Sequence, residues 1–208
     1  LGKAAAQGQL DKKADVIYSA AGLAGSGAIE AVSKAGKWNI GVDSDQYKQE
    51  GLSAYKESIL TSVTKDVEDS VFNLIKSVQD GKPTTGEIRY GLDKDGVGLS
   101  MSNPAFAKMT DVIAAVDKAK QEIIDDASVT GDNIANIVFN EEQGSYLAGV
   151  AAALKSKDGQ VGFIGGVETP LIKKFEAGYI QGAKDTDPSV KVLPQYLTQP
   201  PNFDGFSK

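Results

Sequence analysis

The 208-residue chain contains no cysteine and no histidine. It therefore forms no disulfide and offers no thiol nucleophile, no histidine-based catalytic triad and none of the usual zinc ligand sets. Because no convincing acid–base pair replaces them, we expect no enzyme: no catalytic residues, no metal and no cofactor. The lack of cysteine is compatible with an oxidising, extracytoplasmic setting.

Positive charge and long apolar runs are scarce as well. The 22 lysine and arginine residues are outnumbered by 28 acidic residues, which gives a net charge of -6 and an isoelectric point of about 4.8. We therefore expect no nucleic-acid partner. No apolar run approaches the roughly 20 residues that cross a bilayer. The chain starts at Leu1 and shows no signal peptide, so we expect a processed or engineered, soluble chain without a signal or anchor.

What the chain does contain is an alternation of apolar strands and amphipathic helices. Strands with an apolar centre are predicted in "ADVIYSAAG", "WNIGVD", "NIANIVF", "GQVGFIGG" and "VKVLPQYLT". Segments with helical spacing lie between them, and "EEQGSYLAGVAAALKSK" has a face of small residues suited to close packing. This alternation predicts one α/β domain over residues 1–208, built on a parallel sheet with right-handed crossovers.

Two further elements are predicted in the first half of the chain. Apolar residues at helical spacing from Val63 to Val78 predict a long helix, which Gly81 and Pro83 end. The stretch "TGEIRYGLDKDGVGLSM" predicts a β-hairpin with "DKDG" as its turn.

Two glycine-rich or acidic stretches follow strands, where open parallel sheets bind ligands. Gly22, Gly25 and Gly27 in "AAGLAGSG" open a helix, so backbone N–H groups can face a ligand oxygen. Their spacing differs from the dinucleotide pattern G-x-G-x-x-G, and a plain tight turn is an equal alternative. Asp43 in "GVDSDQ" can accept hydrogen bonds from vicinal sugar hydroxyls, or else cap the next helix or pair with a lysine.

A lysine and two aromatic residues complete the candidates. Lys65 falls in the first turn of the predicted long helix, where the helix dipole disfavours a cation. Either an anionic or hydroxyl-bearing ligand holds it there, or it is an ordinary solvated lysine. Phe203 and Phe206 lie in "PPNFDGF", where they can stack on a base or sugar, or fold back over the core.

Five segments resemble the basic membrane protein (BMP) family of ABC-transporter solute-binding lipoproteins, which includes PnrA-like purine nucleoside receptors. They are "ADVIYSAAGLAGSG", "IGVDSDQ", "ILTSVTKDV", "VFNEEQGSYLAGVAAAL" and "GFIGGVETPLIKKFEAGYIQGAK". The resemblance implies a three-layer, flavodoxin- or Rossmann-like lobe of a type I periplasmic-binding-protein fold. It also implies an extracytoplasmic, membrane-anchored parent that partners an ABC permease.

The order of these segments differs from the order in the family. Residues 1–125 resemble the family's carboxyl-terminal part, and residues 126–208 resemble its middle part, which here comes second. Linking Lys208 to Leu1 would restore the order, so we expect a circular permutant, natural or engineered, joined around "QEIIDDASVTGDN". The family's amino-terminal part has no counterpart, so we expect mainly the second lobe.

The resemblance also implies a role for each candidate residue. Asp43 would bind ribose hydroxyls, Lys65 would donate to the same sugar, Gly22 would approach the ligand through its backbone, and Phe203 would stack on the base. With half of the cleft absent, we expect purine nucleoside binding to be weak or lost.

Pairing of two chains could rebuild a cleft. We expect the former lobe interface, around "ILTSVTKD" and "NIANIVF", to be exposed and apolar and to favour a homodimer. Two other interpretations stay open: a folding scaffold that binds no ligand, and a nucleotide-binding α/β enzyme.

Overall fold

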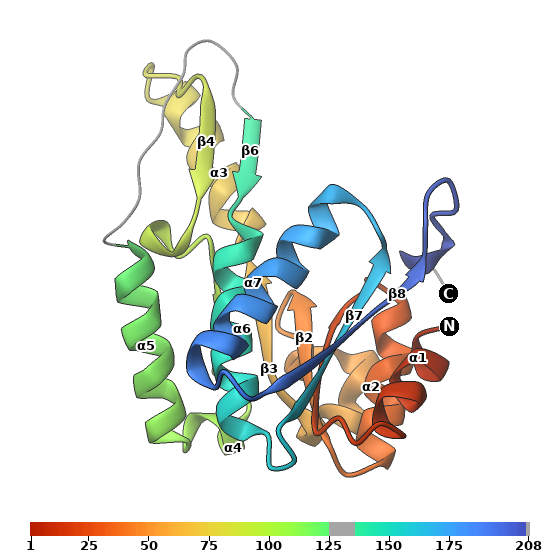
Figure 1. The fold of residues 1–208 in the computed structure, drawn as a ribbon. Coiled ribbons are helices and arrows are strands. Elements are labelled where there is room, and N and C mark those ends of the chain that lie inside the picture. Colours follow the sequence, from red (N-terminus) through yellow and green to blue (C-terminus); the bar gives the residue numbers. More distant parts are fainter. Residues whose placement is uncertain (125–135, 207–208) are drawn as a thin grey trace.

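The computed structural model describes residues 1–124 and 136–206 (Figure 1). Its α-helices are α1 (Gly2–Leu10), α2 (Ala24–Lys34), α3 (Val67–Gln79), α4 (Pro104–Ala107), α5 (Thr110–Ile124), α6 (Glu141–Lys155) and α7 (Pro170–Thr186). Its strands are β1 (Val16–Ala20), β2 (Trp38–Asp43), β3 (Ile59–Lys65), β4 (Glu87–Tyr90), β5 (Val97–Leu99), β6 (Asn136–Phe139), β7 (Gln160–Val167) and β8 (Lys191–Thr198). Short 3-10 helices are η1 (Gln46–Lys48), η2 (Glu50–Ser58), η3 (Leu92–Lys94) and η4 (Asp204–Phe206).

Six strands form the main sheet in the order β5-β3-β2-β1-β7-β8. Every neighbouring pair is parallel except β3 and β5, which run antiparallel. At the centre, Tyr18 on β1 lies opposite Ile40 on β2 and Phe163 on β7. The predicted α/β fold with a parallel sheet is therefore confirmed.

Helices cover both faces of the main sheet, because alternate side chains of its strands point in opposite directions. Val16 and Tyr18 pack with residues of α6 and α7, whereas Ile17 packs with residues of α1 and α2. All three side chains are fully buried. Burial on both faces explains why Val16 and Ile17 follow each other without a polar residue between them.

Glycines bring α6 and α7 close together. A Cβ atom at Gly149 would clash with the carbonyl oxygen of Tyr179, and one at Gly182 would clash with the carbonyl oxygen of Tyr146. The small-residue face of α6 thus packs tightly against a neighbouring helix, as the sequence predicts.

The predicted hairpin is wrong. β4 pairs in parallel with β6 in a separate two-stranded sheet, with Tyr90 opposite Phe139, while β5 joins the main sheet beside β3. The stretch "DKDG" contributes to η3 and to Asp95, whose φ of 51° turns the chain toward the main sheet. The turn residues indicate correctly that the chain bends, but the partner of β4 comes from a distant segment.

The long helix starts later than predicted. β3 is buried through Val63 and runs to Lys65, so the apolar pattern there belongs to a strand. α3 begins at Val67, and the Asp66 carboxylate caps it by accepting a hydrogen bond from the Asp69 N–H at 2.9 Å.

Among the described residues, α3 carries an exposed apolar surface. Five of its side chains are 41–62% exposed, and we call them the α3 surface: Val67, Val71, Phe72, Ile75 and Val78. The expectation of an exposed patch at "ILTSVTKD" is wrong, since β3 is buried through Val63. The side chains of residues 133–138 in "NIANIVF" lie outside the described residues, as does most of the expected join, residues 125–133. In the described ranges, no helix has the length and apolar character needed to cross a membrane.

Candidate ligand site at the carboxyl edge of the main sheet

The candidate residues lie where parallel strands end. Asp43 and Lys65 are the last residues of β2 and β3, and Gly22 follows β1, so all three stand at one edge of the sheet. In the main sheet, β2 and then β3 follow β1 toward one edge, whereas β7 and then β8 follow it toward the other edge. The two directions diverge between β1 and β7, and ligands of open α/β sheets bind at such points.

Asp43 and Lys65 form an ion pair at this edge. The Lys65 Nζ atom lies 2.9 Å from the Asp43 Oδ1 atom. Of the alternatives considered for Asp43, the structure thus shows the ion pair with a lysine. The backbone of Asp43 is left-handed, with φ at 67°. That conformation costs of order 1 kcal/mol for a non-glycine residue, and such strain gathers at ligand-binding sites.

The prediction that Lys65 lies in the first turn of a helix is wrong. Lys65 is the last residue of β3 and precedes Asp66, the cap of α3, so the helix dipole does not act against it there. Its side chain is only 21% exposed. The Nζ atom lies 5.9 Å from the ring centroid of Phe139 and 5.7 Å from that of Phe175, within cation–π range. A carboxylate and two rings thus hold Lys65, which is not an ordinary solvated lysine. Sequence reasoning assigned no role to either ring.

A buried hydroxyl lies near the pair. The Tyr18 Oη atom is 3.5 Å from the Ser145 Oγ atom, and both residues are buried. Burial raises the pKa of Tyr18, the Ser145 hydroxyl partly offsets this, and the charges of Asp43 and Glu141 raise the pKa further. The phenol is therefore neutral at physiological pH, and two carboxylates lie close enough to influence it.

The glycine-rich stretch forms a turn whose backbone groups are already engaged. Gly22 is exposed and has a φ of 50°, and the next amide, Leu23 N–H, donates to the Phe206 carbonyl at 3.1 Å. A Cβ atom at Gly27 would lie 3.2 Å from Lys3 N, so this glycine lets α2 approach α1. Turn formation and helix packing account for these glycines without a bound phosphate.

The two phenylalanines of the last loop behave differently. Phe206 is half-buried, packs against the core, and occupies the space where a Cβ atom at Gly166 would be. Phe203 is 57% exposed. Of the two alternatives considered, folding back over the core applies to Phe206, whereas the ring of Phe203 is exposed.

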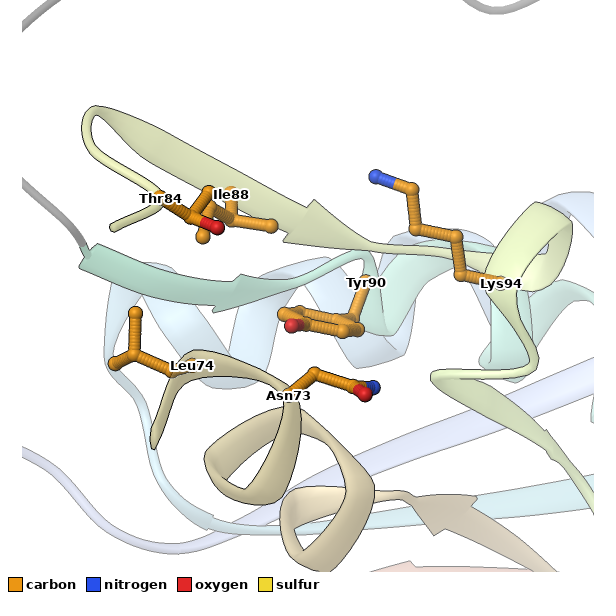
Figure 2. A pocket seen from close by; sticks show the side chains of 6 residues that line it. All are labelled: Asn73, Leu74, Thr84, Ile88, Tyr90 and Lys94. Atoms are coloured by element: carbon orange, nitrogen blue, oxygen red, sulfur yellow. The ribbon is translucent and has the colours of Figure 1, made fainter. Parts of the chain in front are cut away.

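Two hollows lie elsewhere, and neither is lined by the four candidate residues. Figure 2 shows the first, of 260 Å³, between α3 and the segment that contains β4; it is lined by Asn73, Leu74, Thr84, Ile88, Tyr90 and Lys94. The Tyr90 hydroxyl donates to the Ser70 carbonyl at 3.4 Å, and Lys94 donates to the Arg89 carbonyl at 3.2 Å. The second hollow, of 280 Å³, lies mainly between β5 and α5.

The structure therefore brings Asp43 and Lys65 into direct contact, and it connects Gly22 to the loop that carries Phe203 through Phe206. Within residues 1–124 and 136–206, no group of three or more acidic, cysteine or histidine side chains is placed to hold a metal ion.

One known family matches almost the whole chain. The family described as "ABC transporter substrate-binding protein PnrA-like" matches residues 1–125 and, in a second match, residues 101–200.

Curated relatives match shorter parts. The CD4+ T-cell-stimulating antigen of Listeria monocytogenes is 41% identical over 93 residues, which is 43% of this chain and 26% of that protein. The ABC transporter nucleoside-binding protein BmpA of Lactococcus lactis is 37% identical over 103 residues, 49% of this chain and 28% of that protein. Basic membrane protein D of Borreliella burgdorferi is 28% identical over 148 residues, 69% of this chain and 43% of that protein. The matched region thus spans less than half of each relative.

Proposed function

This chain belongs to the PnrA-like family of ABC transporter substrate-binding proteins, and on that premise we propose that it binds a purine nucleoside at the carboxyl edge of its main sheet. The name of the Lactococcus lactis relative, a nucleoside-binding protein, supports the ligand class. In this proposal the chain binds and releases its ligand without catalysis.

The Asp43–Lys65 ion pair is the observation that carries the proposal. The Asp43 side chain is 53% exposed and can accept hydrogen bonds from the vicinal hydroxyls of ribose. Lys65, held between its carboxylate and two rings, is oriented in advance to donate to the same hydroxyl oxygens. A diol can therefore bind the Asp43 carboxylate and the Lys65 ammonium group together while the ion pair between them stays intact.

The base would be bound next to the sugar. Phe203 offers an exposed ring on which a purine can stack. Gly22 is exposed at the same edge, next to the loop that carries Phe203, and in this proposal its backbone contacts the ligand.

We expect affinity to be low, because in this proposal the chain supplies one wall of a two-walled cleft. The reported matches cover only 26–43% of each relative. A nucleoside on one wall stays half in water, where its hydrogen bonds compete with solvent, so we expect a dissociation constant in the millimolar range. A full-length, two-lobed protein of this family would act outside the cytoplasm and pass its ligand to an ABC permease.

The order of segments belongs to the proposal too. Residues 1–125 would be the family's carboxyl-terminal part and residues 126–208 its middle part, circularly permuted within a single lobe; two separate family matches support this. Both ends of the described chain meet at the start of α2 (Figure 1): Gly2 packs against the Ala24 carbonyl, and the Phe206 carbonyl accepts from Leu23.

Two copies of the chain would pair through the α3 surface. A second copy brings an identical apolar helix, and packing the two helices together would bury both. α3 lies beside the two-stranded sheet of β4 and β6 (Figure 1), and so small a sheet has few strands to protect its edges. Such a dimer would be one way to enclose a ligand.

A nucleotide-dependent enzyme explains the site less well. At the start of α2 the Leu23 amide donates to the Phe206 carbonyl, and the Gly25 amide donates to the Gly22 carbonyl. A phosphate would have to displace these hydrogen bonds before it could occupy the helix N-terminus.

The test is an NMR titration of isotope-labelled protein with inosine, guanosine and adenosine, up to about 10 mM to cover millimolar dissociation constants. Asp43→Asn removes the carboxylate that would bind ribose. Asp95→Asn is a matched control, because Asp95 is also left-handed, with φ at 51°, and also pairs with a lysine, Lys120, at 2.7 Å.

We expect saturable shifts in the wild type and in Asp95→Asn, and their loss in Asp43→Asn. A folded wild type that shows no shifts would refute the function. Equal binding by Asp43→Asn would refute this site, and sedimentation at the same concentrations would show whether binding accompanies pairing.

A further inference from the structure

Glu141 is buried, and one oxygen of its carboxylate has no hydrogen-bond partner in the described part of the chain. It is the first residue of α6, and only 5% of its surface is exposed. Among the described residues, no group donates to its Oε2 atom, which is itself buried. An unpaired buried acceptor normally destabilises a fold, so its presence calls for a compensating role.

The helix dipole alone does not explain this burial. An acidic residue in the first turn interacts favourably with the helix N-terminus, but it does so equally well from an exposed position. Glu142 stands in the same turn and is less buried, and its Oε2 atom is also buried without a hydrogen-bond partner among the described residues. The two residues differ in place: the charge of Glu141 acts on the Tyr18 hydroxyl, and that of Glu142 is not among the charges that do.

The surroundings of Glu141 place it at the candidate site. Phe139, two residues earlier, has its ring 5.9 Å from the Lys65 Nζ atom. Ser145, one helical turn later on the same face of α6, lies 3.5 Å from the Tyr18 hydroxyl. The charges of Glu141 and Asp43 both act on that hydroxyl. Two carboxylates from segments far apart in the chain, Asp43 and Glu141, therefore act on the edge where Lys65 ends β3.

We propose that Glu141 is a third ligand-binding residue, whose free oxygen accepts a hydrogen bond from one hydroxyl of the ligand's sugar. This inference rests on the proposed nucleoside function. Asp43 and Lys65 bind the diol from the ends of β2 and β3, and Glu141 binds a further hydroxyl from the start of α6. The ligand thereby satisfies an acceptor that the protein leaves unpaired.

Binding of inosine and of its 2′-, 3′- and 5′-deoxy analogues is measured by NMR titration for the wild type, Glu141→Gln and, as a control in the same helical turn, Glu142→Gln. Loss of a hydrogen bond to a charged acceptor should weaken inosine binding about tenfold or more in Glu141→Gln. One deoxy analogue, which lacks the engaged hydroxyl, should bind the wild type and Glu141→Gln equally. Glu142→Gln should match the wild type.

Thermal unfolding without ligand gives a second, independent readout, for which Glu141→Met replaces the carboxylate by an apolar side chain of similar volume. An unpaired carboxylate reserved for a ligand destabilises the free protein, so Tm should rise by about 2–4 °C. A structural role would instead lower Tm.

Each combination of results decides the question. If the wild type binds inosine but Glu141→Gln binds equally well, or loses all four ligands by the same factor, the inference is wrong while the proposed function stands. If the wild type binds no nucleoside, the proposed function fails and this inference fails with it. If the wild type binds inosine and Tm falls in Glu141→Met, the Glu141 carboxylate has a structural role and the inference is overturned.

Discussion

Replacing Asp15 by asparagine should destabilise the protein at neutral pH and have little effect in acid. Asp15 precedes β1, and its side chain is 8% exposed. It forms an ion pair with Lys37, which precedes β2, and accepts hydrogen bonds from the backbone N–H groups of Lys157 at 3.3 Å and Asp158 at 2.8 Å. One carboxylate therefore ties the starts of β1 and β2 to the turn before β7.

The magnitude follows from these contacts. Burial by itself would raise the pKa of Asp15, but the hydrogen bonds from Lys37 and Asp158 and the Lys37 charge outweigh it, so the pKa lies below its usual value. A hydrogen bond to a charged group contributes about 1.5–3 kcal/mol, and asparagine keeps one acceptor oxygen. Allowing for the partly exposed Lys37, we expect the free energy of unfolding to fall by about 2 kcal/mol and Tm by about 4–8 °C.

The pH dependence has a definite sign. A carboxylate whose pKa is lower in the folded state stabilises the protein above its unfolded pKa of about 3.9, and this contribution is lost as pH falls through the folded value. Urea unfolding followed by circular dichroism at pH 7 and in acid below the unfolded pKa measures the change.

Glu30→Gln is the control for this experiment. Hydrogen bonds from Lys34 and Lys3 lower the pKa of Glu30 to about 2, but the carboxylate lies at the surface, where solvent screens its interactions. Its replacement should change stability far less than Asp15→Asn. A loss under about 0.5 kcal/mol for Asp15→Asn at pH 7, or the same loss at both pH values, would refute the reasoning.

Three further predictions concern packing, the last loop and association. Gly149→Ala should lower the free energy of unfolding by about 1–3 kcal/mol, because the added Cβ atom overpacks against α7. Gly8→Ala should raise it by about 0.5–1 kcal/mol, because Gly8 has open space around it in α1. Chemical denaturation measures both changes. Phe203→Ala should weaken nucleoside binding in the NMR titration and leave Tm unchanged, whereas Phe206→Ala should lower Tm; the reverse pattern would contradict their assignments. Phe72→Glu should shift sedimentation toward the monomer, and an unchanged profile would exclude pairing through the α3 surface.

Local pattern was sufficient for much of the fold. The apolar run in β1 predicted a strand covered on both faces, and small residues along α6 predicted close helix packing; burial and the α7 contact confirm both. Asp43 was identified because it follows a buried strand. These predictions hold because strand burial and helix periodicity are properties of a few neighbouring residues.

The local sequence pattern could not predict which distant segments pair with each other. The segment from Glu87 to Leu99 has the alternation and turn residues of a hairpin, yet β4 pairs with β6 and β5 with β3. The start of α3 was misplaced for a related reason: valines at positions 63 and 67 fit a helix, but only burial of β3 within the sheet shows that the first belongs to a strand.

In the candidate site, too, some features follow from the sequence alone and others from the tertiary structure. The sequence by itself placed Asp43 and Gly22 directly after apolar strands, because position after an apolar strand is a local property, but it assigned Lys65 to a helix. Only the tertiary structure decided that Lys65 contacts Asp43 and two phenylalanine rings, and that Glu141 is buried near them with one oxygen that no described residue contacts by a hydrogen bond. These groups come from segments far apart in the chain. Their contacts depend on which strands become neighbours, and burial across the whole sheet decides that order.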